Sequence, residues 1–226
     1  MRGGFVLLII SIVTMGVAAQ TPAWDSTYRP NNFASKVEQF RSYANSAKDV
    51  IFLGNSITAG TDWPELLQLP TAKNRGISGD ISFGVLERLS EVTEGKPAKV
   101  FILIGINDIS RNIPDSIIIR NYRMMMTRIQ QESPKTRIYF QTLLPVNNEF
   151  TQFKNHYNKD EHIAAVNNAI RSFATEKNVT VIDLHPKFLN SEGKLDKKLC
   201  IDGLHLNPEG YKVWALLLQQ GKYLSN

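Results

Sequence analysis

The chain has 226 residues, a formal net charge of +5 and one cysteine, Cys200. A single cysteine cannot form an internal disulfide, which argues against a disulfide scaffold. The positive charges are scattered with no sustained basic stripe, so we interpret them as a solvated surface and expect no nucleic-acid partner. No Cys/His cluster suggests zinc, and the Gly-x-Gly-x-x-Gly and P-loop patterns do not occur. We therefore expect no metal and no cofactor.

The first residues, 1–19, have the layout of a secretory signal peptide. Met1-Arg2 is a short basic start, Phe5 to Val13 is almost wholly apolar, and small residues close the segment at Val17-Ala18-Ala19. We predict cleavage after Ala19, which leaves one domain over residues 20–226, secreted or periplasmic. The alternative is an uncleaved anchor, but the apolar stretch is shorter than the roughly 20 residues that a span needs. We expect no stable membrane span after cleavage.

The rest of the chain alternates between short apolar runs and segments with helical spacing. In chain order, the pattern predicts an extended leader over Gln20–Asn32, a helix over Phe33–Ala47, and strands over Asp49–Leu53 and Lys73–Ile77. A helix over Ile81–Val92, a strand over Ala98–Ile104, a helix over Pro114–Gln131 and a strand over Thr136–Leu143 follow. The pattern ends with a helix over Glu161–Glu176, a strand over Val179–Leu184 and a last helix that begins at Pro208.

This order of elements indicates the fold class. Strands that alternate with helices, with the central strands apolar throughout, are typical of a mainly parallel sheet covered on both faces. We predict an α/β fold, a three-layer α/β/α sandwich with a five-stranded sheet. Right-handed crossovers place the C-terminal ends of all strands at one edge. Ser56, Gly79 and Asn107 each lie just past such an end, so we expect them in one ligand-binding crevice.

Two short motifs at opposite ends of the chain carry candidate chemistry. Gly54–Ile57 places Ser56 after a buried strand, and Asp202–His205 sets a carboxylate and an imidazole three residues apart. A serine hydroxyl is a weak nucleophile until a base takes its proton, and a carboxylate improves that base by fixing its tautomer. Each motif alone also fits a plain turn, the second one followed by a helix cap at Asn207.

Four segments in combination resemble the conserved blocks of the SGNH hydrolases, also called GDSL-type esterases and lipases. They are Phe52–Thr58, Asn74–Asp80, Gly105–Asp108 and Asp202–His205. The stretch from Asn74 to Leu89 is similar to the branch with platelet-activating-factor acetylhydrolase subunits and bacterial carbohydrate acetylesterases. The resemblance covers nearly the whole predicted mature chain, and it implies the flavodoxin-like form of the α/β/α sandwich.

The resemblance also implies the roles of particular residues. It makes Ser56, Asp202 and His205 the catalytic residues. It also implies an oxyanion hole formed by the Ser56 and Gly79 backbone N–H groups and the Asn107 side chain. The family's aspartate before its serine is Asn55 here, and because that aspartate is not the triad acid, we expect the nucleophilic chemistry to survive.

Other chemistry-bearing residues have weaker signals. His156, His162 and His185 have no metal-ligand partner at a useful spacing, and we interpret them as structural or surface residues. Trp63 and the loop from Asn147 to Tyr157 are candidates for a pocket wall, although Trp63 fits core packing equally well.

The expected function is a secreted serine esterase that removes small acyl groups, above all acetyl, from carbohydrate esters such as sialate or xylan O-acetyl esters. Its expected partner is a small-molecule or oligosaccharide ester. A lysophospholipase or thioesterase on the same triad is an alternative, but the sequence shows no long apolar lid segment. A non-catalytic carbohydrate-binding protein is a further alternative, and retention of all five site residues argues against it.

Overall fold

The computed structural model describes residues 24–225, so the predicted signal peptide and its cleavage site lie outside the described residues. Five strands form one wholly parallel sheet in the order β2-β1-β3-β4-β5. The strands are β1 (Val50–Gly54), β2 (Ala72–Gly76), β3 (Lys99–Leu103), β4 (Arg137–Gln141) and β5 (Val179–Ile182). The predicted fold class is confirmed. The strand order changes direction between β1 and β3, which is where open α/β sheets form a crevice.

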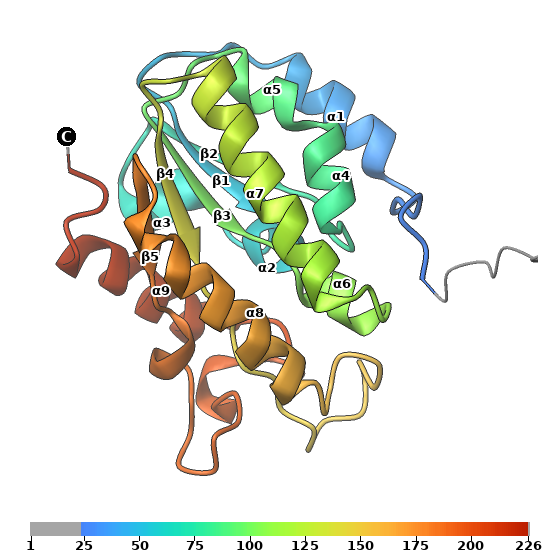
Figure 1. Cartoon of the computed structure of the whole chain (residues 1–226). Helices are drawn as coiled ribbons and strands as arrows, with labels where there is room; N and C mark the ends of the chain where they lie inside the picture. The colour runs from blue at the N-terminus through green and yellow to red at the C-terminus, as the bar shows by residue number, and fades with distance from the viewer. Residues whose placement is uncertain (1–23, 226) are drawn as a thin grey trace, which may run out of the picture.

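Helices cover both faces of the sheet (Figure 1). The α-helices are α1 (Phe33–Arg41), α2 (Ser56–Ala59), α3 (Trp63–Leu67), α4 (Ser82–Glu87), α5 (Leu89–Thr93), α6 (Ile106–Ser110), α7 (Asp115–Glu132), α8 (Asp160–Ser172) and α9 (Pro208–Gln220). Short 3-10 turns are η1 (Phe173–Thr175), η2 (His185–Lys187) and η3 (Lys197–Leu199). No helix within residues 24–225 is both long and apolar enough to cross a membrane.

Stacked aromatic rings join the sheet to α3 and α9. The Phe52 ring lies 4.0 Å from that of Trp63 and 5.0 Å from that of Phe101, its neighbour across the β1–β3 pair. Trp63 in turn meets Trp214 of α9 edge-on at 4.8 Å. Aromatic pairs in these geometries contribute about 0.5–1.5 kcal/mol beyond their buried area. Trp63 is fully buried and packs in the core, and it also lines a cavity of about 880 Å³ next to α3.

The other face is covered by α7 and α8, which cross in front of the sheet in Figure 1. Along α7 the residues Ile118, Tyr122, Met125 and Ile129 are fully buried and recur at helical spacing. Tyr122 packs on Phe140 of β4, with ring centroids 5.3 Å apart. The amphipathic pattern of this segment therefore determines which side of the helix meets the sheet.

Three predicted helices differ from the structure. The first, predicted to reach Ala47, ends at Arg41, and Tyr43 beyond its end is 45% exposed. The one predicted over Glu161–Glu176 ends as α8 at Ser172 and is followed by the 3-10 turn η1. The segment predicted as one helix over residues 81–92 is divided into α4 and α5 at Arg88. At this break the fully buried Arg88 side chain donates hydrogen bonds to the carbonyl oxygens of Gly54 and Arg75.

Candidate active site

Ser56, His205 and Asp202 form a continuous hydrogen-bonded row. Ser56 is the first residue of α2, directly after β1, and Asn55 caps this helix by accepting a hydrogen bond from the Ile57 N–H at 3.0 Å. The Ser56 hydroxyl lies 3.0 Å from His205 Nε2. On the other side of the ring, His205 Nδ1 lies 2.8 Å from Asp202 Oδ2. The structure thus brings together the three predicted catalytic residues.

A tight turn before α9 holds the carboxylate. Asp202 Oδ1 accepts the Leu204 N–H at 3.0 Å and the His205 N–H at 2.8 Å. Partial burial raises the pKa of Asp202, but these bonds and the His205 ring outweigh it and hold the pKa below its ordinary value. Gly203 completes the turn with φ +79, where a Cβ would collide with the Asn147 carbonyl. Asp202 is therefore ionised at neutral pH and keeps the proton of the neutral imidazole on Nδ1.

Besides Ser56, the predicted oxyanion residues Gly79 and Asn107 follow the ends of β2 and β3, the two strands that flank β1. Asn107 is the second residue of α6, after β3, and its amide nitrogen donates to the Asp80 carbonyl oxygen at 2.9 Å. Gly79, in the loop after β2, has φ +80, a conformation that favours glycine. A Cβ at this glycine would be in ordinary contact with Pro30 and the Tyr28 hydroxyl. The N-terminal segment thus packs directly against the loop of Gly79.

A cavity of about 370 Å³ opens on these groups. Its lining residues are Ser56, Ser78, Gly79, Asn107, Ser110, Arg111, Phe153, His156, Leu204 and His205. It contains every predicted site residue except Asp202, which lies behind the His205 ring. A larger cavity, of about 880 Å³, is lined by residues of α1, α3 and β2 and contains none of the three predicted catalytic residues.

The cavity wall includes a histidine that sequence reasoning had placed elsewhere. His156 was interpreted as a structural or surface residue, but its Nε2 lies 3.0 Å from Asn107 Oδ1. Burial, with the nearby charges of His205 and Arg111, lowers the pKa of His156 to about 4. Phe153 of the same loop packs edge-on against the His205 ring, with centroids 4.9 Å apart. The loop containing both had been singled out as a candidate pocket wall.

The remaining two histidines, His162 and His185, lie outside the cavity. His162 is exposed and contacts Asp115 at 3.0 Å, and His185 Nδ1 lies 2.8 Å from the Leu143 carbonyl oxygen. Within residues 24–225, no group of three or more His, Cys, Asp or Glu side chains is arranged to hold a metal ion.

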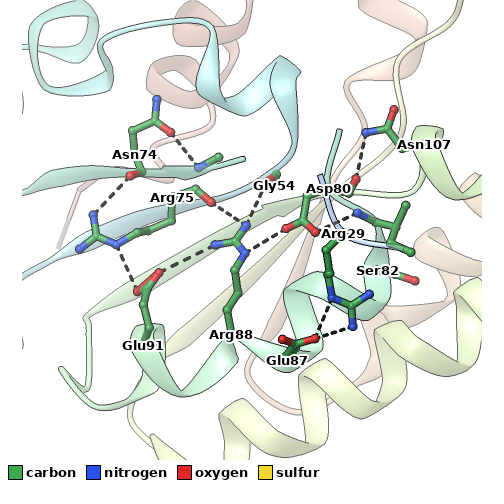
Figure 2. A network of polar contacts seen from close by, with 12 residues as sticks. Arg29, Gly54, Asn74, Arg75, Asp80, Ser82, Glu87, Arg88, Glu91 and Asn107 are labelled. Carbon is green, nitrogen blue, oxygen red and sulfur yellow. Dashed lines mark hydrogen bonds and ion pairs between the residues drawn. The ribbon is translucent and has the colours of Figure 1, made fainter. Parts of the chain in front are cut away.

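A buried network of charged side chains lies next to Asp80, the residue that accepts the hydrogen bond from Asn107 (Figure 2). Arg88 donates to Asp80 Oδ2 at 2.9 Å, to the Gly54 carbonyl at 3.1 Å and to the Arg75 carbonyl at 2.9 Å. The Arg88 side chain thereby links the ends of β1 and β2 to Asp80, whose carbonyl oxygen accepts the hydrogen bond from the Asn107 amide. The residues Asp80, Arg88 and Glu91 have fully buried side chains, so the network lies inside the protein.

Asp108, next to Asn107, fixes α6 against the start of α4. Its fully buried carboxyl group accepts hydrogen bonds from both the Ser82 N–H, at 3.0 Å, and the Ser82 hydroxyl. Burial raises the pKa of Asp108 to about 7, although the bonds from Ser82 partly oppose this. The position of Asn107 is therefore secured by its neighbour as well as by its own side chain.

A serine, an imidazole and a carboxylate bonded in this order, at the C-terminal edge of a parallel sheet, form the arrangement by which serine hydrolases activate their nucleophile. Comparison with known proteins agrees with this class. The model of the GDSL-like Lipase/Acylhydrolase family matches residues 52–213, and the chain belongs to this family.

The individual relatives have low sequence identity to this chain, between 24% and 26%. Platelet-activating factor acetylhydrolase IB subunit alpha2 of Homo sapiens is 26% identical over 170 residues, which are 72% of this chain and 71% of that protein. N-acylneuraminate cytidylyltransferase of Streptococcus agalactiae serotype V is 24% identical over 172 residues. This match covers 76% of the chain but only 38% of that protein. The solved structure of a candidate acylhydrolase from Bacteroides fragilis is 25% identical, with a TM-score of 0.74 over 85% of this chain and 97% of that one.

Proposed function

We propose that this protein is a serine esterase that removes short acyl groups, above all acetyl, from carbohydrate esters. The observation that carries the proposal is the row of hydrogen bonds from Ser56 through His205 to Asp202, which ends at a cavity. Membership of an acylhydrolase family supports the ester-cleaving part of the proposal. The acyl group and the acceptor are inferred from the cavity and from the relatives.

The geometry supports a two-step mechanism. In the first step the Ser56 hydroxyl attacks the ester carbonyl carbon while His205 Nε2 takes its proton, and Asp202 stabilises the imidazolium. The Asn107 amide, with the backbone N–H groups of Ser56 and Gly79, receives the negative oxygen of the tetrahedral intermediate. The intermediate collapses when His205 protonates the departing alcohol. In the second step water attacks the acyl-serine with the same base, which releases the acid and restores Ser56.

The size of the cavity supports a short acyl group. Its volume of about 370 Å³ is in the lower part of the range of about 300–1,000 Å³ of ligand pockets. The same space must hold the acyl group and the first part of the acceptor. The similarity to an acetylhydrolase subunit agrees with acetyl as that group.

Two further observations support a carbohydrate acceptor outside the cytoplasm. One relative is named for its action on N-acylneuraminate, a sugar acid. The signal-like segment over residues 1–19 would export the enzyme to the periplasm or the medium. A sialate or xylan O-acetyl ester is therefore the substrate type that we propose.

The acyl preference is tested by kcat/KM for p-nitrophenyl esters from acetate to dodecanoate. We expect acetate and butyrate to be cleaved best, with a clear decline from octanoate onward. A preference for long chains would instead support a lysophospholipase or thioesterase. Absence of turnover on every ester, with a folded protein, would favour the non-catalytic carbohydrate-binding alternative. Acetate release from acetylated sialic acid and from acetylated xylan fragments then compares the two acceptors.

A further inference from the structure

We propose that Arg111 forms a subsite for a carboxylate on the acyl acceptor, so that the preferred substrate is an ester of a sugar acid rather than of a neutral sugar. This inference rests on the proposed function, because it names the substrate class for the same cavity. An acetyl group carries no charge of its own. A negatively charged group that reaches the cavity therefore belongs to the acceptor side of the ester.

Arg111 is positioned next to the reacting groups. It follows the last residue of α6, and its backbone N–H bonds to the Asn107 and Asp108 carbonyl oxygens at 3.2 and 3.1 Å. It therefore lies one helical turn beyond the oxyanion amide and lines the cavity together with Ser56 and His205.

The guanidinium group is held in place by an aromatic ring. Arg111 Cζ lies 3.1 Å from the centroid of the Tyr28 ring, in the N-terminal segment that packs against Gly79. Stacking on an aromatic face occupies the flat side of a guanidinium and leaves the N–H donors at its edge available. An arginine restrained in this way loses less conformational entropy when it binds a ligand.

The charge of Arg111 has no carboxylate partner in the described part of the chain. Six other arginines each contact a carboxylate: Arg29, Arg75, Arg88, Arg123, Arg128 and Arg171. Hydrogen bonds from Thr27 are the main reason that the pKa of Asp25 is lowered, and Arg111 adds only a small long-range effect.

Among the residues of the described range 24–225 that line the cavity, Arg111 is also the only one whose side chain carries a permanent charge. Its charge contributes to the lowered pKa of His156, another residue of the cavity wall. A cavity with one unpaired guanidinium attracts an anion, and a planar carboxylate matches the guanidinium fork with two parallel hydrogen bonds. Uronic and sialic acids carry such a carboxylate, whereas neutral xylose units do not.

The test uses two acetyl esters that differ in charge, 4-acetoxybenzoate and 4-acetoxybenzamide. The ratio of their kcat/KM values is compared between parent and variants, so that the different leaving groups cancel. We expect Arg111→Gln to reduce kcat/KM for the benzoate about 10- to 100-fold, mainly through KM, as the loss of a charge-assisted hydrogen bond predicts. The kcat/KM for the benzamide should change less than about twofold, because its neutral amide makes no ion pair with the guanidinium.

Three further variants refine the result. Arg111→Lys keeps the charge but not the planar fork, and Tyr28→Leu keeps Arg111 but removes its aromatic support, so both should give intermediate ratios. Arg123→Gln removes a distant exposed positive charge and should leave the ratio as in the parent. An unchanged ratio in Arg111→Gln, or equal losses on both esters, would overturn the subsite while the proposed function stood. Failure of the parent to cleave p-nitrophenyl acetate would remove the proposed function itself.

Discussion

The hydrogen bond of 3.0 Å between His156 Nε2 and Asn107 Oδ1 fixes the orientation of the oxyanion amide. The Asp80 carbonyl can only accept, so the atom of Asn107 that faces it at 2.9 Å must be the nitrogen. The amide oxygen then faces His156, whose Nε2 must carry a proton. With its pKa lowered to about 4, the ring is neutral at pH 7 and donates from Nε2 alone. The second N–H of the Asn107 amide remains for the developing oxyanion.

We predict that His156→Gln and His156→Asn differ in kcat. A glutamine amide extends to the position of Nε2 and can still donate to Asn107, whereas an asparagine amide ends near Nδ1. The asparagine variant should lose about tenfold in kcat with little change in KM, the size expected for one lost hydrogen bond. The glutamine variant should retain most of the activity. Equal losses in the two variants, measured with p-nitrophenyl acetate, would show that His156 acts only through packing.

Asn107→Ala should lower kcat by roughly 10²–10³ and change KM little, because the amide bonds the oxygen most strongly when it is negative. If Asn107 were only a turn residue, the substitution would reduce thermal stability and leave kcat per folded molecule almost unchanged. Both quantities are measured on the same preparation, by thermal unfolding and by steady-state kinetics.

Asp202→Asn should act through His205 and lower kcat by roughly 10⁴, because an amide leaves the imidazole in the wrong tautomer. The two backbone bonds to Asp202 Oδ1 are compatible with an asparagine oxygen, so the turn should persist. Circular dichroism and the melting temperature check the fold, and the kinetics check the chemistry. Activity within tenfold of the parent would exclude the assigned role.

Asp108 should make stability fall as pH rises. Its folded-state pKa of about 7 is above the ordinary 3.8, so between these values the native state binds more protons than the unfolded state. Its contribution is complete below about pH 3.8 and is lost as pH rises through about 7. Asp108→Asn cannot titrate, and its stability relative to the parent should improve from pH 5 to 8, by up to about 1.4 kcal/mol per pH unit below pH 7. Urea unfolding at four pH values measures this, and a constant difference would contradict it.

Arg88→Met should destabilise the fold by about 3–5 kcal/mol, because it leaves the buried Asp80 carboxyl group without its guanidinium partner, while Glu91 keeps its ion pair with Arg75. The exposed pair of Arg123 and Glu176 provides the matched control, and Arg123→Met should cost only about 0–1 kcal/mol. Urea unfolding of both variants gives the comparison. Similar small losses in the two would show that the network adds nothing to stability.

The sheet and the catalytic row could be predicted because local patterns encode them. The central strands β1 and β3 are short apolar runs, whereas β2, with the sequence AKNRG, is largely polar. The predicted limits of β1 and β2 differ from the observed ones by one residue at each end. Ser56, Asp202 and His205 occur in motifs whose combination is specific. The short helices α2, α3 and α6 were missed because four or five residues are too few to show helical periodicity.

The features that the sequence did not predict depend on contacts between segments that are distant in the chain. The spacing of Val85, Leu89 and Val92 continues through the break at Arg88, so periodicity alone predicts a single helix. At the break, the Arg88 side chain bonds to carbonyl groups in β1 and β2, and the local sequence does not reveal these contacts. His156 lies 49 residues from Asn107 in the sequence, and Arg111 contacts Tyr28 of the leader segment. No local pattern signals either contact.

The most direct test of the central claim, that Ser56 is the nucleophile, is to locate the covalent adduct formed by a fluorophosphonate. Peptide mass spectrometry of the labelled protein should find one modified residue, Ser56, which lies 3.0 Å from its base. Ser56→Ala should neither be labelled nor hydrolyse p-nitrophenyl acetate above background, with the circular dichroism spectrum of the parent. A single adduct at Ser56, absent from the folded variant, is the result we predict. Labelling at another residue, or undiminished turnover by Ser56→Ala, would contradict it.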